Sequence, residues 1–188
     1  MKLSLLVPEN VCLQIVDVQE SLMAKIHQAD RVAANVALMI NCCRILGVSM
    51  VANTQYAKGL GLYLPELEKL AASIPRFDKT EFNCLANPQT AAYYRKLPSH
   101  KDTIVLVGVE THICIYQTAM GLLDGGYNVW VVTDAVSSRK LEDHQDGLAR
   151  LLAACAVLGS SEMLIYELLG KAGTPQFKEV LPYIINRD

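Results

Sequence analysis

The sequence has few of the features that mark membrane-spanning or nucleic-acid-binding proteins. No apolar run reaches the roughly 18 residues that a transmembrane helix requires. The 17 lysine and arginine residues are outnumbered by 19 aspartate and glutamate residues, and they form no cluster. With a formal net charge of -2, the sequence shows no sign of a basic patch that would attract phosphate groups. We therefore expect neither a membrane nor a nucleic acid among its partners.

The sequence also has no recognisable secretion signal and no two cysteines at CxxC spacing. Residues 1–10 carry one lysine and a short leucine-rich piece that ends at Pro8, which is too short for a signal peptide. Four of the six cysteines lie within apolar strand or helix patterns, which favours reduced thiols and predicts a cytoplasmic protein. The six are Cys12, Cys42, Cys43, Cys84, Cys114 and Cys155.

No internal repeat, low-complexity tract or linker divides the 188 residues, so we predict a single domain spanning residues 1–188. Short β-branched apolar runs alternate with runs that are apolar at helical spacing. This alternation predicts a three-layer α/β/α sandwich with a central parallel, Rossmann-like sheet. Asp30 is expected to cap the first long helix. The expected strands are 11–18, 48–54, 103–107, 128–133 and 156–159. The expected helices are 30–46, 66–72, 89–97, 113–123, 142–155, 163–169 and 175–185. Residues 55–64 are expected to form a loop, and residues 75–79 an extended piece.

The stretch from Thr103 to Thr118 predicts a buried strand, a break at Gly108 and then a helix. Cys114 is expected in the first turn of that helix, where unpaired backbone N–H groups and the helix dipole favour a thiolate. Ligands of open α/β sheets bind at this edge, beyond the carboxyl ends of the strands. We interpret Cys114 as a candidate nucleophile. The alternative, that Cys114 is a small apolar residue of the core, stays open at this point.

Asp17 and Lys79 are candidates for the groups that would assist such a nucleophile. If the first and third main strands are neighbours, Asp17 lies at the same sheet edge as Cys114, where its carboxylate can accept the thiol proton and later activate water. Lys79 lies between two phenylalanines in FDKTEF, and an ammonium group there would stabilise a thiolate. The alternatives are a turn-forming aspartate and an ordinary solvated lysine.

Taken together, three separated motifs resemble the Asp-Lys-Cys triad of isochorismatase-like cysteine hydrolases. They are Asp17 in IVDVQ, Lys79 in FDKTEF and Cys114 in VGVETHICI, in that order along the chain. The resemblance covers nearly the whole chain and implies an isochorismatase-type sheet.

Other segments extend the resemblance. TDAVSSR at Thr133–Arg139 is similar to the segment that follows the fifth strand in that family. The loop at Asn53–Gly61 and the segment Pro175–Glu179 resemble the isochorismatase-domain-containing subgroup.

The resemblance implies a metal-independent hydrolase of a small molecule. In such enzymes the cysteine attacks an electrophilic carbon to give a covalent, thioester-type intermediate that water releases, here at an amide-like C–N bond or, as the alternative, a vinyl ether. A non-proline cis peptide is implied at Val109–Glu110, which would aim the backbone N–H groups of Glu110 and Cys114 at one point as an oxyanion hole. The Glu110 side chain is a departure, because many relatives have a small or hydroxyl residue there.

The sequence also departs from the metal-dependent nicotinamidases of the same superfamily. Those enzymes carry an Asp-x-His cluster after the second strand, and the matching stretch here is Asn53-Thr54-Gln55. None of the four histidines has metal-ligand spacing with another. We therefore predict no catalytic metal and no other cofactor, and we place His112 at the rim of the site.

The lining of the substrate pocket and the assembly of the protein are further expectations. We expect a homo-oligomer, since relatives commonly assemble as dimers or larger rings. A scaffold or ligand-binding protein, or a redox-sensing thiol protein with Cys84 near Cys114, remains the alternative to an enzyme. The expected pocket-lining residues are Gln19, Gln55, Tyr56, Phe82 and Tyr116.

Overall fold

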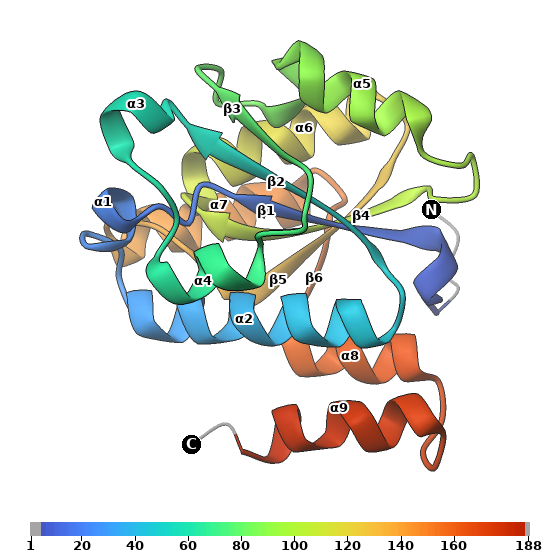
Figure 1. Ribbon diagram of the computed structural model, residues 1–188. Coiled ribbons are helices and arrows are strands. Elements are labelled where there is room, and N and C mark those ends of the chain that lie inside the picture. The colour runs from blue at the N-terminus through green and yellow to red at the C-terminus, as the bar shows by residue number, and fades with distance from the viewer. Residues whose placement is uncertain (1–4, 187–188) are drawn as a thin grey trace.

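Six parallel strands form one sheet with helices on both of its faces, as the sequence predicted (Figure 1). The computed structural model describes residues 5–186. The strands are β1 (Val11–Val16), β2 (Ser49–Gln55), β3 (Arg76–Lys79), β4 (Thr103–Val109), β5 (Asn128–Ser137) and β6 (Val157–Gly159). The α-helices are α1 (Glu20–Met23), α2 (Ala29–Ile45), α3 (Ala57–Leu60), α4 (Pro65–Leu70), α5 (Pro88–Lys96), α6 (Tyr116–Asp124), α7 (Leu141–Ala153), α8 (Ser161–Leu169) and α9 (Pro175–Ile185).

The sheet is the middle of three layers, and an apolar core lies between it and the helices on each face. Successive strand residues point to opposite faces, so that in β1 Leu13 and Ile15 join the core beneath α2, whereas Cys12 and Val16 join the core on the other face. Helices α2, α8 and α9 lie on the first side of the sheet, and α5 and α6 on the second (Figure 1). Because both faces are covered, β1 and β4 are buried along their whole length.

The strand order is β3-β2-β1-β4-β5-β6. The chain therefore winds outward in one direction from β1 and in the other from β4, and the order reverses between these two neighbours. In open α/β sheets the carboxyl ends of the strands at such a reversal frame the ligand site. The predicted adjacency of the first and third main strands is confirmed, since β1 pairs with β4 from Val11↔Thr103 to Val16↔Gly108.

Several local predictions about the elements were wrong. Strand β4 continues through Gly108 to Val109, because Gly108 lies against β1 rather than ending the strand. The predicted loop after β2 contains the short helix α3, whereas the extended piece expected at 75–79 is confirmed as the edge strand β3. Asp30 lies within the first turn of α2, and the residue at the capping position is Gln28, which makes no side-chain capping bond. At the start of α8, the Ser160 hydroxyl caps the helix by accepting from the Met163 N–H at 3.3 Å.

All six cysteines are free, in agreement with the prediction of reduced thiols. Only Cys155 is exposed among them. Among the helices that the structure describes, none combines the length and the apolar composition that a membrane crossing requires.

Candidate functional site

Asp17 follows the last residue of β1 and is fully buried. Its backbone adopts a left-handed conformation with φ of 53°, which aspartate tolerates better than most residues. The N–H of Asp17 donates to the Asn53 carbonyl of β2 at 3.1 Å, so the turn is held by the neighbouring strand. The end of β1 thus presents a carboxyl group at the point where the strand order reverses.

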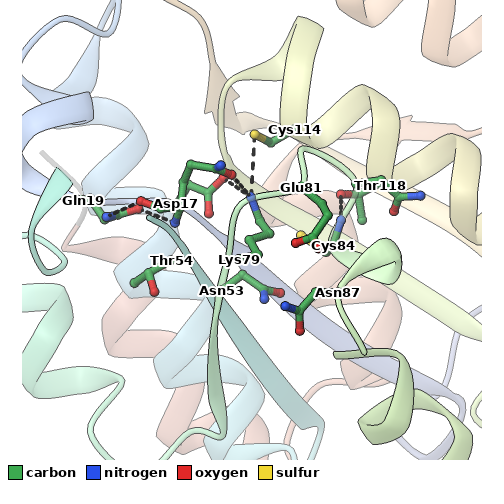
Figure 2. A network of polar contacts seen from close by, with 12 residues as sticks. Asp17, Gln19, Asn53, Thr54, Lys79, Glu81, Cys84, Asn87, Cys114 and Thr118 are labelled. Atoms are coloured by element: carbon green, nitrogen blue, oxygen red, sulfur yellow. Dashed lines mark hydrogen bonds and ion pairs between the residues drawn. The ribbon is translucent and has the colours of Figure 1, made fainter. Parts of the chain in front are cut away.

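Lys79 is the last residue of β3 and reaches from there to Asp17. Its Nζ lies 2.7 Å from Asp17 Oδ2, and the residue is only 2% exposed. Figure 2 shows the lysine between Asp17 and Cys114, with its ammonium group directed at both. A buried ion pair of this kind needs further hydrogen bonds to offset its desolvation, and Lys79 has one to Gln55 Oε1 at 2.6 Å.

Cys114 lies in a π-helical turn, Thr111–Ile115, that precedes α6. The expectation of a position in the first turn of an α-helix was therefore wrong in detail. The turn closes around the carbonyl oxygen of Glu110, which accepts from the N–H groups of Ile113 and Ile115 at 3.1 Å each. The Sγ atom lies 3.8 Å from Lys79 Nζ, and Cys114 is 7% exposed. The structure thus brings the three candidate side chains together.

The electrostatics favour a neutral thiol in the resting protein, contrary to the predicted thiolate. Burial raises the pKa of Cys114 well above its ordinary value, the nearby Asp17 carboxylate raises it further, and Lys79 opposes both. Burial also raises the pKa of Asp17, with Lys79 opposing the rise. For Lys79, burial disfavours the ammonium form, but the Asp17 carboxylate together with Cys84 and Cys114 outweighs this effect, and the pKa is raised. A nucleophilic Cys114 therefore needs a base to remove its proton.

One oxygen of Asp17 is free to act as that base. Oδ2 binds Lys79, whereas no group of residues 5–186 makes a well-formed hydrogen bond to Oδ1, although this atom is buried. The Cys114 thiol is near enough to act on the Asp17 carboxyl as a hydrogen-bond donor, which lowers the pKa of Asp17 in part. A buried carboxylate oxygen without a hydrogen-bond partner lowers the stability of the fold. Such an atom therefore calls for a functional explanation.

Gln19 and Gln55, two of the expected pocket-lining residues, make contacts with protein groups. Gln19 is fully buried, and its amide binds both backbone groups of Gln55 and the carbonyl of Gly61. The Gln55 side chain accepts from Lys79 and donates to the Thr80 carbonyl. The observed contacts of both residues hold the site together.

The other three residues expected in the pocket are aromatic, and the backbone N–H of one of them, Tyr56, donates to the Lys79 carbonyl at 2.8 Å. Tyr56 and Phe82 are half exposed, at 49% and 50%. The hydroxyl of Tyr116 accepts from Arg150 at 2.6 Å, and the same guanidinium lies over its ring. Their contact with a substrate stays a prediction.

The peptide bond between Val109 and Glu110 is cis, as the family resemblance implied. The Glu110 carboxylate accepts from the backbone N–H and the Nε of Arg139 at 2.9 and 3.1 Å. Sequence reasoning singled out both residues but did not pair them. Beside this ion pair lies a cavity of about 280 Å³, lined in addition by α1 and the loop after it and by Leu60.

A buried polar layer behind the site was missed by the sequence reasoning. Gln14 lies in the middle of β1, donates to Asn53 Oδ1 and accepts from the Tyr94 hydroxyl of α5. Asn53 in turn donates to Thr90 of α5 and to the Phe77 carbonyl of β3. The layer joins α5, β1, β2 and β3, and therefore supports the strand that carries Lys79. The available signal was a glutamine within an otherwise apolar strand, VCLQIV.

Among residues 5–186, no three histidine, cysteine, aspartate or glutamate side chains are arranged to hold a metal ion. His112, expected at the rim, is half-buried and hydrogen-bonds through Nδ1 to Ser138 Oγ at 2.8 Å. His144 is buried against Thr111, and burial lowers the pKa of its imidazole.

Comparison with known proteins identifies the family. The model of the isochorismatase domain matches residues 11–163. The secreted isochorismatase effector Isc1 of Phytophthora sojae is 34% identical over 182 residues, which are 95% of this chain and 86% of that protein. Isochorismatase domain-containing protein 2 of Xenopus laevis is 37% identical over 169 residues, 90% of this chain and 80% of the relative.

Solved structures agree with this assignment. The MAR1 ribonuclease of Caenorhabditis elegans is 35% identical with a TM-score of 0.90, over 97% of this chain and 93% of that one. The ycaC gene product of Escherichia coli, an octameric hydrolase of unknown specificity, shares the fold at 19% identity and a TM-score of 0.87, over 100% and 90% of the two chains. The chain therefore belongs to the isochorismatase family, and this membership supports activity as a hydrolase.

Proposed function

We propose that the protein is a metal-independent cysteine hydrolase that cleaves an amide-like C–N bond of a small molecule. Asp17, Lys79 and Cys114 are its catalytic residues. The observation that carries the proposal is the position of Lys79 Nζ, 2.7 Å from Asp17 Oδ2 and 3.8 Å from Cys114 Sγ, in a site where all three residues are buried. A structural domain has no need of an acid, an amine and a thiol converging at the reversal of strand order.

The first half of the reaction forms a thioester. Asp17 Oδ1 takes the thiol proton as Cys114 Sγ attacks the carbonyl carbon, and the backbone N–H groups of Glu110 and Cys114 bind the resulting oxyanion. Asp17 then gives that proton to the departing amine, and the C–N bond breaks. A neutral resting thiol suits this sequence, because the proton leaves only when the nucleophile attacks.

The second half regenerates the thiol. Asp17 removes a proton from a water molecule that attacks the thioester, and the same proton returns to sulfur as the carboxylic acid leaves. Lys79 remains charged throughout, because its pKa is raised by Asp17. Its ammonium group stabilises the carboxylate before each proton transfer and the thiolate whenever sulfur carries negative charge.

The dimensions of the site support a small substrate. Cys114 and Lys79 are 7% and 2% exposed, so a reacting group must enter the protein to reach them. The name of the Caenorhabditis elegans neighbour makes RNA cleavage a second candidate. The burial of the thiol and the net charge of -2 favour the small molecule.

The two alternatives to an enzyme have less support. A redox-sensing cysteine needs a low thiol pKa, whereas burial raises the pKa of Cys114 and raises the pKa of Cys84 to about 12. A ligand-binding scaffold does not require a buried carboxylate oxygen without a hydrogen-bond partner.

The test is a screen of small amides, carbamates and a short RNA, with and without a metal chelator. We expect hydrolysis of at least one small amide or carbamate, no effect of the chelator and no cleavage of RNA. The Cys114→Ala variant should lose about a thousandfold or more in kcat, while Cys155→Ser, which changes an exposed cysteine, should be unaffected. Hydrolysis by Cys114→Ala at the wild-type rate would disprove the proposal.

We also propose that the protein is a homo-oligomer. The octameric neighbour from Escherichia coli supports this, and light scattering coupled to size-exclusion chromatography measures it directly. The cytoplasmic location predicted from the sequence stays a prediction.

A further inference from the structure

The ammonium group of Lys79 has three N–H donors and three surrounding acceptors. They are Asp17 Oδ2 at 2.7 Å, Gln55 Oε1 at 2.6 Å and Cys114 Sγ at 3.8 Å. An ammonium group only donates, so the Gln55 atom facing it must be the carbonyl oxygen. The position of the ammonium group is therefore set by Gln55 as well as by the two proposed catalytic partners.

Gln55 is held both through its side chain and through its backbone. Its Nε2 donates to the Thr80 carbonyl at 2.9 Å, which fixes the rotation of the amide. Its backbone N–H donates to Gln19 Oε1 at 2.7 Å, and its backbone carbonyl accepts from Gln19 Nε2 at 3.1 Å. Gln19 is fully buried and also donates to the Gly61 carbonyl at 2.7 Å. Gln55 Oε1 is thus a preorganised acceptor for Lys79.

The contact leaves one oxygen of Asp17 free. Lys79 binds only Oδ2, and Oδ1 has no well-formed hydrogen bond from any described residue. Without the acceptor on Gln55, the ammonium group would have a buried, unpaired N–H. Turning that N–H toward Oδ1 would satisfy it and would occupy the oxygen that must receive the thiol proton.

We infer that Gln55 is a positioning residue: it holds one N–H of Lys79 so that Asp17 Oδ1 remains available to the Cys114 thiol. This inference rests on the proposed function, because it concerns the same three side chains. It replaces the sequence-based interpretation of Gln55 as a substrate contact. Gln55 touches neither sulfur nor substrate in this account and acts through Lys79 alone.

Alkylation of Cys114 by iodoacetamide tests the inference without a known substrate. Sulfur displaces iodide to form an S–CH₂ bond, and the thiol proton passes to Asp17. Because the exposed Cys155 would also react, all proteins carry Cys155→Ser, and peptide mass spectrometry confirms that the adduct is on Cys114. The variants are Gln55→Met, which keeps the length and removes the acceptor, and Gln55→Glu, which keeps an acceptor and adds a charge. Gln117→Met, at an exposed position of α6, is the matched control.

We expect Gln55→Met to lower the alkylation rate constant at pH 7 by about tenfold or more, since the base is then occupied. Gln55→Glu should shift the pH profile of alkylation upward by about one unit, because added negative charge raises the pKa of the thiol. Gln117→Met should react like the parent protein.

Wild-type alkylation rates and pH profiles in both Gln55 variants would overturn the inference. A loss of rate in Gln55→Met without a pH shift in Gln55→Glu would also overturn it, because that result indicates only a disturbed structure. Neither result affects the proposed function, whose failure is recognised separately by an unchanged kcat in Cys114→Ala.

Discussion

Replacing Lys79 with methionine is expected to destabilise the protein by about 3–5 kcal/mol near pH 8 and to abolish hydrolysis. Lys79 and Asp17 form an ion pair whose side chains are 0% and 1% exposed. Methionine has a similar length and no charge, so it fills the space but leaves the carboxylate of Asp17 buried without its cation. Most of the expected loss is the penalty for that isolated charge.

The penalty should depend on pH in a definite direction. Burial raises the pKa of Asp17 above its ordinary value of 3.8, and without Lys79 no cation opposes the rise. A carboxyl group with a raised pKa in the folded state stabilises the protein in its protonated form. That contribution is present at low pH and is lost as the pH rises through the folded pKa. Lys79→Met should therefore differ less from the wild type at pH 5 than at pH 8, as measured by urea unfolding.

The double variant Asp17→Asn/Lys79→Met is the matched control. It removes both charges, so we expect it to recover most of the lost stability while remaining inactive. If the double variant is as unstable as Lys79→Met, or if Lys79→Met is as stable as the wild type at pH 8, the ion pair does not have the energetic role described above.

Replacing Gly108 with alanine is expected to cost about 3–5 kcal/mol of stability and to inactivate the protein. Gly108 has φ of +112°, and a Cβ atom there would lie 2.0 Å from the backbone oxygen of Val16. The obstruction is backbone, so the end of β1 must move. Asp17 is the next residue after Val16, and the cis bond to Glu110 follows close behind Gly108. The same displacement therefore moves both Asp17 and the turn that begins at Glu110.

Gly47→Ala is the control for this prediction. Gly47 also has a positive φ, +70°, but nothing lies within 4 Å of the Cβ position. The control carries only the cost of a left-handed alanine, about 1–2 kcal/mol, and should remain active. Equal urea midpoints for the two variants would show that the approach of β1 to Gly108 is unimportant.

The position of Asp17 and Cys114 at one sheet edge was predictable from the sequence. Alternating apolar strands and helices imply parallel strands whose carboxyl ends share an edge, and this reasoning depends only on short-range patterns. The contact of Lys79 with Asp17 and Cys114 was harder to predict from the sequence, because β3 has four residues and a mixed composition. Its role depends on the register that sets Lys79 beside Gln55. Register between neighbouring strands is a property of the assembled sheet.

The state of the Cys114 thiol was predicted wrongly because the reasoning was local. A helix start and a nearby lysine both favour the thiolate, but burial and the Asp17 carboxylate outweigh them once the chain is folded. The π-helical turn could not be predicted from the sequence either, because it depends on which N–H groups reach the Glu110 carbonyl. The sequence analysis interpreted Gly108 as a break in the strand, whereas in the structure it allows the close approach of β1. This reason could not be found locally, because its neighbour Val16 is 92 residues earlier in the sequence.

The central claim is that Cys114 becomes covalently attached to the substrate. Its most direct test is the peptide mass of the protein after brief reaction with p-nitrophenyl acetate, an activated ester that does not require knowledge of the natural substrate. We predict rapid release of nitrophenol with one acetyl group on Cys114, and neither event in Cys114→Ala. Nitrophenol release without an acetyl group on Cys114, or at the same rate in Cys114→Ala, would contradict the account.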